Sequence, residues 1–382
     1  MRNADTEFYI DVFVQSELEE LVDVVNVVAY DRTCQGDNID IRVRTKELED
    51  LHGGIEISRT TTHPVEHLNS ERPWLDEECA RNHEVTLLDR SGDVAAQMAG
   101  IDAIVDFGGN ITRDELDIAS AAGIDFVQMV TNGLDHCEVE YARSLGFTVC
   151  HCPSNLSAES LAQNAMMFIL MLAGRYREAA ANFAKGMLYK PRSYGVAGKP
   201  LLIVGYGASG VELARRAHAC GMRIWANDIR NISSDERDEL SLERVGGPGE
   251  LASMVAEADV ISVHLHLTDA TRHVISADLI ASMKPTAWVS NVARGELIDE
   301  TALYQALLDG KIGGAGIDVF GVEPPPVDHP VFQLPTVIAT PHTAGGSEVT
   351  MKNRGVFCGK NLDRLGRGEE PLGIVTGVLV KT

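Results

Sequence analysis

Residues 200–228 read PLLIVGYGASGVELARRAHACGMRIWAND, and this stretch decides the fold. An apolar strand runs into the turn Gly205-Tyr206-Gly207-Ala208-Ser209-Gly210, and a helical stretch follows at once. In such a unit the first glycine permits a tight turn, the second lets the backbone approach a pyrophosphate, and the third allows helix and strand to pack closely. The helix N-terminus presents unpaired N–H groups to the phosphates. The stretch therefore predicts a dinucleotide-binding site.

An acidic residue at the end of the next strand narrows the choice of cofactor. Asp228 follows Gly210 by 228 − 210 = 18 residues. A carboxylate at this point accepts both ribose hydroxyls of NAD and repels the 2′-phosphate of NADP. A glycine turn followed by a surface aspartate is the alternative explanation, and the two features together favour NAD. The nearby Arg230 leaves dual cofactor use open.

Strand-like and helix-like segments alternate on both sides of this unit. One alternation runs from Gly54 to Cys152, and a second runs from Pro200 to His342. The apolar runs of the second alternation have little polar interruption, as parallel strands covered on both faces require. Between them, residues 158–186 predict one long helix with Ser154 or Ser157 as its N-cap. Residues 352–368 predict a helix in the tail. We predict an α/β protein with two Rossmann-like or flavodoxin-like domains.

Composition excludes several classes of partner. The chain has 382 residues, of which 45% are hydrophobic and 23% charged, values typical of a globular enzyme. Its 33 basic and 56 acidic residues give a net charge of −23, which argues against nucleic acid and leaves adaptation to high salt open. The N-terminus resembles no signal peptide, and no apolar run has membrane-spanning length. We expect a cytoplasmic protein with no membrane partner.

The seven cysteines do not predict a disulfide framework, because their number is odd and their spacing irregular. The tract Cys150-His151-Cys152 has metal-ligating residue types, but adjacent ligands with no second pair fit zinc spacing poorly. Strand packing explains this tract better. We therefore predict no metal site.

Three candidate catalytic residues follow predicted strands of the second alternation. Arg294 follows the strand 286–293, Glu323 follows the strand 313–320, and His342 ends the segment 336–342. The carboxyl ends of strands are where ligands bind in open α/β sheets. The arginine fork grips a carboxylate, and histidine exchanges a proton near neutral pH. A nearby carboxylate favours and orients the imidazolium that protonates a developing alkoxide. Each residue alone has a structural explanation, but together they predict reduction of a 2-keto acid.

The run SNVARGELIDETALYQALLDGKIGGAGIDVFGVEPPP (290–326) and the later TPHTAGGS (340–347) resemble the signature of the D-isomer-specific 2-hydroxyacid dehydrogenases. The resemblance extends from about Gly54 to the C-terminus. It implies that Arg294, Glu323 and His342 are the catalytic arginine, glutamate and histidine. It also implies hydride transfer between nicotinamide C4 and C2 of a small 2-hydroxy or 2-keto acid, with His342 as acid and base.

The resemblance further implies a domain plan. A nucleotide domain of residues 158–346 is inserted into a substrate domain of residues 54–157 and 347–382, and the active-site cleft lies between them. A homodimer joined through the nucleotide domains is expected. The extension 1–53 has no counterpart in the family that would indicate its role.

Two further groups of residues are assigned by the same resemblance. The substrate carboxylate is expected to meet Arg294 and the loops at Gly108, Gly109, Asn132 and Gly133. The dinucleotide is expected to meet Gly205, Gly207, Ala208, Ser209, Gly210, Asp228, Ile229, Arg230, His264, Leu265, Thr271, Val292, Ala293, Arg294, Asp318, His342 and Ala344, with Asp318 at the nicotinamide carboxamide.

The sequence departs from the family pattern at a few positions. Ala208-Ser209 stands where an Arg-Ile pair is common, His266 where proline is usual, and Gln163 where glutamate is usual. None of these departures concerns the three catalytic candidates.

Other functions on the same fold remain open. A formate-type dehydrogenase resembles the pattern with glutamine at the Glu323 position, which argues against that activity. A phosphoglycerate dehydrogenase often has a further regulatory domain, and only 382 − 346 = 36 residues follow Gly346. A short form of it, or an NAD(H)-sensing protein similar to the corepressors with this fold, stays an alternative. The substrate side chain is not indicated by the sequence.

Overall fold

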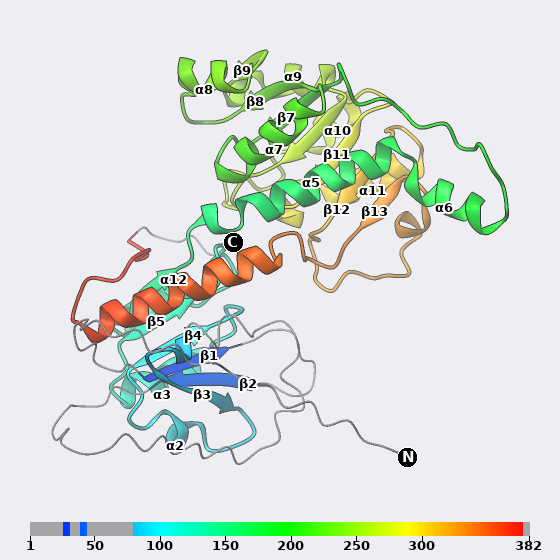
Figure 1. Cartoon of the computed structure of the whole chain (residues 1–382). Helices are drawn as coiled ribbons and strands as arrows, with labels where there is room; N and C mark the ends of the chain where they lie inside the picture. The colour runs from blue at the N-terminus through cyan, green and yellow to red at the C-terminus, as the bar shows by residue number, and fades with distance from the viewer. Residues whose placement is uncertain (1–25, 31–38, 44–78, 377–382) are drawn as a thin grey trace, which may run out of the picture.

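The computed structural model describes residues 26–30, 39–43 and 79–376. They form two α/β lobes, each built around one sheet, with the helices α5 (Ala158–Ala173) and α12 (Glu348–Gly366) lying between them (Figure 1). The α/β class with parallel sheets is thus confirmed. The start of the first predicted alternation, residues 54–78, lies outside the described residues.

The first lobe has a six-stranded sheet in the order β1-β3-β2-β4-β5-β6. β4, β5 and β6 pair in parallel, whereas β2 runs antiparallel to β1, β3 and β4. β1 and β2 fall within residues 1–53, so this stretch supplies two strands of the sheet, a contribution that the sequence did not indicate. The elements are β1 (Asn26–Tyr30), β2 (Ile39–Val43), β3 (Glu84–Asp89), α2 (Val94–Met98), β4 (Ala103–Asp106), α3 (Arg113–Ala121), β5 (Phe126–Met129), α4 (Val139–Ser144) and β6 (Thr148–His151).

The second lobe has a seven-stranded parallel sheet in the order β13-β12-β11-β10-β7-β8-β9. The chain winds from β7 toward one edge and from β10 toward the other, so the strand order reverses between these two strands. Ligands bind outside the carboxyl ends of strands at such a switch point. The strands are β7 (Pro200–Val204), β8 (Arg223–Asn227), β9 (Arg244–Gly246), β10 (Val260–Val263), β11 (Trp288–Asn291), β12 (Gly314–Ile317) and β13 (Val337–Ala339).

Helices cover both faces of this second sheet, which explains its uninterrupted apolar strands. Leu202 and Ile261 enter the core on one face, while Leu201, Ile203 and Val260 enter the core on the other. Successive strand residues point to opposite faces, so both parities must be apolar. The covering helices are α7 (Ala208–Ala219), α8 (Ser234–Glu239), α9 (Leu251–Glu257), α10 (Ala277–Ser282) and α11 (Glu300–Leu308), together with α5.

The two helices between the lobes pack on different sheets. α5 packs on the second sheet, where a Cβ atom at Gly316 of β12 would lie 2.3 Å from the Cβ of Phe168. α12 returns to the first sheet and buries Cys358 and Leu362 against Phe126 of β5. The predicted tail helix is therefore confirmed. None of the helices within the described residues has the length and apolarity needed to cross a membrane.

The prediction of one helix over residues 158–186 is wrong. α5 ends at Ala173, and α6 (Tyr176–Ala184) begins after Arg175, whose φ of 50° is left-handed. The break lets Arg177 of α6 donate three hydrogen bonds, of 2.7 to 2.8 Å, to main-chain carbonyls of residues 332–337. Ser157 occupies the N-cap position of α5, but its side chain makes no capping hydrogen bond.

Candidate active site

The glycine turn between β7 and α7 has the geometry that each predicted glycine role requires. Gly205 has a φ of 94°, and a Cβ there would lie 2.5 Å from the carbonyl oxygen of His264. A Cβ at Gly210 would lie 2.3 Å from the Gly205 oxygen, so helix and strand approach too closely for any side chain. At Gly207 a Cβ would meet nothing within 4 Å, which leaves the turn open to a ligand. The turn and the N-terminus of α7 thus fit a bound pyrophosphate.

Asp228 lies beside this turn, at the carboxyl end of β8. One carboxylate oxygen accepts the Tyr206 N–H at 2.6 Å, and the other accepts the Arg230 N–H at 2.9 Å. The Arg230 guanidinium turns away to Glu236, at 2.7 and 3.1 Å, and to the Tyr206 carbonyl. Ile229 between them is 86% exposed. The Asp228 carboxylate is thus held beside the glycine turn, and the Arg230 guanidinium is already paired with Glu236.

His264 connects the glycine turn to β10. Its Nδ1 lies 3.0 Å from the Ser209 hydroxyl, and its Nε2 lies 2.9 Å from the Ser262 hydroxyl. Burial lowers the pKa of His264 to about 4, so the ring is neutral at neutral pH. A neutral imidazole between two hydroxyls orients Ser209 in the first turn of α7, where phosphate oxygens are expected.

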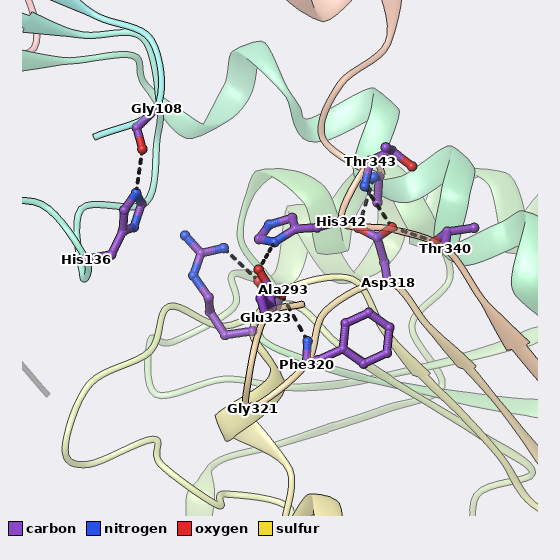
Figure 2. Close-up of polar contacts among 12 residues, drawn as sticks. Gly108, His136, Ala293, Asp318, Phe320, Gly321, Glu323, Thr340, His342 and Thr343 are labelled. Carbon is purple, nitrogen blue, oxygen red and sulfur yellow. Dashed lines mark hydrogen bonds and ion pairs between the residues drawn. The ribbon is translucent and has the colours of Figure 1, made fainter. Parts of the chain in front are cut away.

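Two of the catalytic candidates form a hydrogen-bonded pair. His342 Nδ1 lies 2.7 Å from Glu323 Oε2, and the Phe320 N–H donates to Glu323 Oε1 at 3.1 Å (Figure 2). Burial acts to raise the pKa of the Glu323 carboxyl, but the hydrogen bond and charge of His342 lower it, and the net direction is downward. Glu323 is therefore a carboxylate at neutral pH that can stabilise an imidazolium.

The loop that carries His342 is fixed by a buried carboxylate. Asp318, 1% exposed, accepts hydrogen bonds from the Thr340 hydroxyl at 2.5 Å and from the N–H groups of Thr343 and Ala344 at 2.9 Å each (Figure 2). The His342 N–H donates to the Asp318 carbonyl at 2.8 Å, and His342 has a φ of 56°. The left-handed backbone conformation of a non-glycine residue is unfavourable by about 1–3 kcal/mol, and these hydrogen bonds offset that cost at His342. Asp318 thus orients the histidine loop, a role that the sequence did not indicate.

Arg294, the third candidate, leaves the end of β11 and reaches the first lobe. Its Nε and Nη2 donate to Asp135 at 3.1 to 3.2 Å, and its Nη1 donates to the Ala293 carbonyl at 2.8 Å. The Asn291 side chain fixes the turn by donating to the Arg294 carbonyl. The Arg294 charge also contributes to the lowered pKa of Glu323. The three candidates therefore belong to one site.

The expected substrate loops lie on the first-lobe side of this site. A Cβ at Gly133 would lie 1.7 Å from Arg294 Nη2, so Gly133 lies beside the guanidinium, and Asn132 precedes it in the same loop. The N–H groups of Gly108 and Gly109 donate to the buried Asp106 carboxylate at 3.1 and 2.9 Å, so both are already paired within the first lobe. The Gly108 carbonyl lies 2.9 Å from His136 Nε2 (Figure 2).

Other predicted cofactor contacts are placed as follows. Val292 is 3% exposed and its side chain packs into the core. Both main-chain hydrogen-bonding groups of Ala344 already have partners, since its N–H donates to Asp318 and its carbonyl accepts from Ser160 and Asn164. Leu265 packs beside Gly205, and the Thr271 hydroxyl donates to the His266 carbonyl.

Sequence reasoning missed Asp106 and Asp135. Asp106 is fully buried, and burial raises its pKa against four N–H hydrogen bonds from residues 108–111 that act to lower it. An aspartate two residues before Gly-Gly at the end of a strand was a local signal for such a turn. Asp135 had no comparable signal, because its partner is 159 residues away in the sequence.

Comparison with known proteins gives a consistent result. The family described as D-isomer specific 2-hydroxyacid dehydrogenase, NAD binding domain, matches residues 166–344. A glyoxylate reductase of Korarchaeum cryptofilum is 35% identical over 269 residues, which is 69% of this chain and 79% of that protein. A D-3-phosphoglycerate dehydrogenase of Methanocaldococcus jannaschii is 35% identical over 268 residues, 70% of this chain but only 50% of that protein.

A solved structure extends the similarity to the fold. The D-lactate dehydrogenase of Lactobacillus jensenii with NAD+ superposes with a TM-score of 0.64 at 25% identity, and the match covers 76% of this chain and 90% of that one. The similarity therefore includes both lobes as well as the glycine turn.

Proposed function

This chain belongs to the D-isomer-specific 2-hydroxyacid dehydrogenases, and from that premise we propose how its residues reduce a small 2-keto acid. The family makes it an oxidoreductase that acts on CH–OH donors with a nicotinamide dinucleotide. The bound dinucleotide supplies or takes the hydride. The chain itself must bind the substrate carboxylate and donate a proton to the carbonyl oxygen. It must also position the residues that perform these two tasks.

The proton is assigned to His342. Glu323 holds its Nδ1 at 2.7 Å, which leaves Nε2 as the ring nitrogen that can face a substrate. In reduction the imidazolium gives a proton to the developing alkoxide, and in oxidation the neutral ring takes it back. The Glu323 carboxylate stabilises the charged form between these steps. The Asp318 carboxylate fixes the loop and hence the direction of the ring.

The substrate carboxylate is assigned to Arg294, with the N–H groups of Asn132 and Gly133 opposite. The guanidinium lies against Gly133, where no side chain would fit. A planar fork can bind the carboxylate and polarise the adjacent carbonyl at the same time. Substrate is then held by groups from both lobes, so binding favours a closed cleft.

NAD is the preferred cofactor in this proposal. Asp228 is placed for ribose hydroxyls and would repel a 2′-phosphate. Arg230, two residues further along the chain, is paired with Glu236. The pKa of the Glu236 carboxyl is lowered to about 2 by its hydrogen bond to Arg230, so the anion persists across the physiological range.

The single observation that carries the function is the convergence of His342, Glu323 and Arg294 after the carboxyl ends of strands in the sheet that carries the glycine turn. Steady-state NADH oxidation with glyoxylate, hydroxypyruvate, pyruvate and bulkier 2-keto acids tests it and identifies the substrate. Phosphohydroxypyruvate in the same panel tests a short phosphoglycerate dehydrogenase. Tight NADH binding without turnover of any of these acids would contradict the enzyme and favour a nucleotide sensor.

A homodimer is supported by apolar residues that project from the second lobe. α6 and the segment after it extend away from the body (Figure 1), and Phe183, Leu188 and Tyr189 are 77, 63 and 96% exposed. An apolar groove of about 550 Å³ lies between α5 and the start of α6, and its lining includes Met166, Met167, Leu170, Met171 and Ala179. Exposed apolar patches of this kind mark interfaces. Light scattering should give twice the chain mass, and F183D with L188D should give a monomer; a wild-type monomer contradicts the dimer.

The division into domains, like the homodimer, is a proposal. Residues 158–346 are taken as the nucleotide domain, and residues 54–157 with 347–382 as the substrate domain, because α12 packs on the first sheet. A cytoplasmic location likewise stays a prediction.

A further inference from the structure

The pair between Arg294 and Asp135 joins the two lobes at the catalytic site. Asp135 belongs to the loop between β5 and α4, and Arg294 follows β11. Both Nε and Nη2 of the guanidinium face the same carboxylate, at 3.1 to 3.2 Å. The side chains are 21 and 25% exposed, so the pair is sheltered from solvent.

Asp135 is an anion in this setting. Burial acts to raise the pKa of its carboxyl, but the charge and hydrogen bonds of Arg294 lower it by more, and the net direction is downward. A carboxylate that stays ionised neutralises much of the charge that Arg294 would offer to a substrate. The arrangement therefore weakens simple electrostatic attraction, and a benefit other than affinity must explain it.

The pair with Asp135 determines which N–H donors of the Arg294 guanidinium remain available to a substrate. The group has five N–H donors in a rigid plane. Asp135 occupies the edge formed by Nε and Nη2, and the Ala293 carbonyl takes one hydrogen of Nη1. The donors that remain are one hydrogen on Nη1 and one on Nη2. Gly133 lies beside Nη2, where any side chain larger than hydrogen would collide with that nitrogen, so the absence of a Cβ at Gly133 makes room for the guanidinium.

We propose that Asp135 is a positioning residue for the reaction: it locks one edge of Arg294 so that the other edge meets the carboxylate and carbonyl of the keto acid. This inference rests on the proposed function of Arg294. Because the lock fixes orientation while its charge opposes substrate attraction, Asp135 should favour the transition state more than substrate binding.

The test is the variant Asp135→Asn, which keeps an oxygen acceptor but removes the anion. We expect kcat for the best keto acid to fall by about tenfold, as for loss of one charge-assisted hydrogen bond. KM should stay unchanged or fall, because the guanidinium charge is no longer neutralised. A merely structural role would not separate kcat from KM in this way.

Two further variants control the interpretation. Glu138→Gln removes the same charge three positions along the chain and breaks an ion pair with Arg113 that does not include Arg294; its kinetics should match the wild type. In an Arg294→Lys background, Asp135→Asn should have little further effect on kcat, because the edge that it locks is gone. Wild-type kcat in Asp135→Asn, or full additivity of the two substitutions, would overturn the proposal.

A measurement that needs no turnover separates this inference from the proposed function. The Nε–H resonance of Arg294, assigned by its loss in Arg294→Lys, should be protected from solvent exchange in the NADH-loaded wild type and unprotected in Asp135→Asn. If the wild type reduces no keto acid, the proposed function fails and this resonance alone decides the lock. Equal protection in both proteins would then contradict it.

Discussion

Replacing Glu323 by glutamine tests the acid–base pair at the centre of the proposed reaction. The substitution keeps the size of the side chain and an oxygen that can accept from the Phe320 N–H, now at 3.1 Å. It removes only the negative charge 2.7 Å from His342 Nδ1. Since the lowered pKa of Glu323 comes in part from that histidine, the same coupling must stabilise the imidazolium.

The size of the effect follows from distance and exposure. Two unit charges about 4 Å apart attract by roughly 4 kcal/mol at an effective dielectric constant near 20. The His342 and Glu323 side chains are 40 and 29% exposed, so solvent screens much of this attraction. Fully exposed pairs contribute only about 0.2–1 kcal/mol. An attraction between these two limits, about 1.4 kcal/mol, corresponds to a shift of about one pH unit in the pH profile.

The sign of the pH effect is fixed by the direction of the reaction. Reduction needs the imidazolium, so activity is present at lower pH and is lost where the imidazolium gives up its proton. Without the carboxylate the imidazolium is less stable, and this limb should move toward acid by about one pH unit. The assay measures log kcat/KM for keto-acid reduction over roughly pH 5 to 10.

The matched control is Glu300→Gln. The Glu300 carboxylate accepts the N–H of Gly321 at 2.9 Å and so holds the same loop, without a hydrogen bond to His342. Its pH profile should keep the wild-type limb. An unmoved limb in Glu323→Gln would refute the pairing, and an equal movement in both variants would assign the effect to the loop.

Three other outcomes are expected. Arg294→Lys should lower kcat/KM for keto acids by about 100-fold with NADH affinity unchanged, because a point charge replaces a planar fork; unchanged kinetics would remove Arg294 from the site. Asp228→Ser should raise the ratio of NADPH to NADH kcat/KM by about tenfold through loss of one repulsive charge, and a constant ratio would contradict the role of Asp228. Burial lowers the pKa of His264 from 6.5 to about 4, so its contribution to stability is present above pH 6.5 and is lost as pH falls toward 4, on the order of 3 kcal/mol. Melting temperatures should therefore fall more steeply with acid in the wild type than in His264→Gln, and parallel curves would contradict this.

The second sheet was predictable because its signals are local. Each strand is a short apolar run with both parities filled, as in Leu201 and Leu202, and this pattern is typical of a strand covered on both faces. The roles of Gly205 and Gly210 were also readable, since a tight turn and a close helix each demand glycine at a fixed offset. Turn chemistry and periodicity depend on neighbours in sequence.

The features that sequence reasoning missed depend on distant partners. The break at Arg175 is stabilised by carbonyls near residue 335, which Arg177 reaches only in the folded lobe. Gly174, which caps the C-terminus of α5, was the local sign of this break, but one glycine in a long helical pattern did not decide it. The strand β1 lies within residues 1–53, whose role the sequence did not indicate, and its place in the sheet comes from parallel pairing with β3. A partner 159 residues away decides the role of Asp135 in the same manner.

The two halves of the site are assembled in different ways, and this difference has a consequence for the order of events. The proposed acid–base pair of Glu323 and His342 lies within the second lobe, as does Asp318, which fixes the histidine loop. The proposed site for the substrate carboxylate combines Arg294 of the second lobe with Asp135 and Gly133 of the first. A change in the angle between the lobes therefore leaves the proton donor assembled and alters only the surroundings of the arginine. Closure of the cleft should control when the substrate is held, and the donor should be ready before it closes.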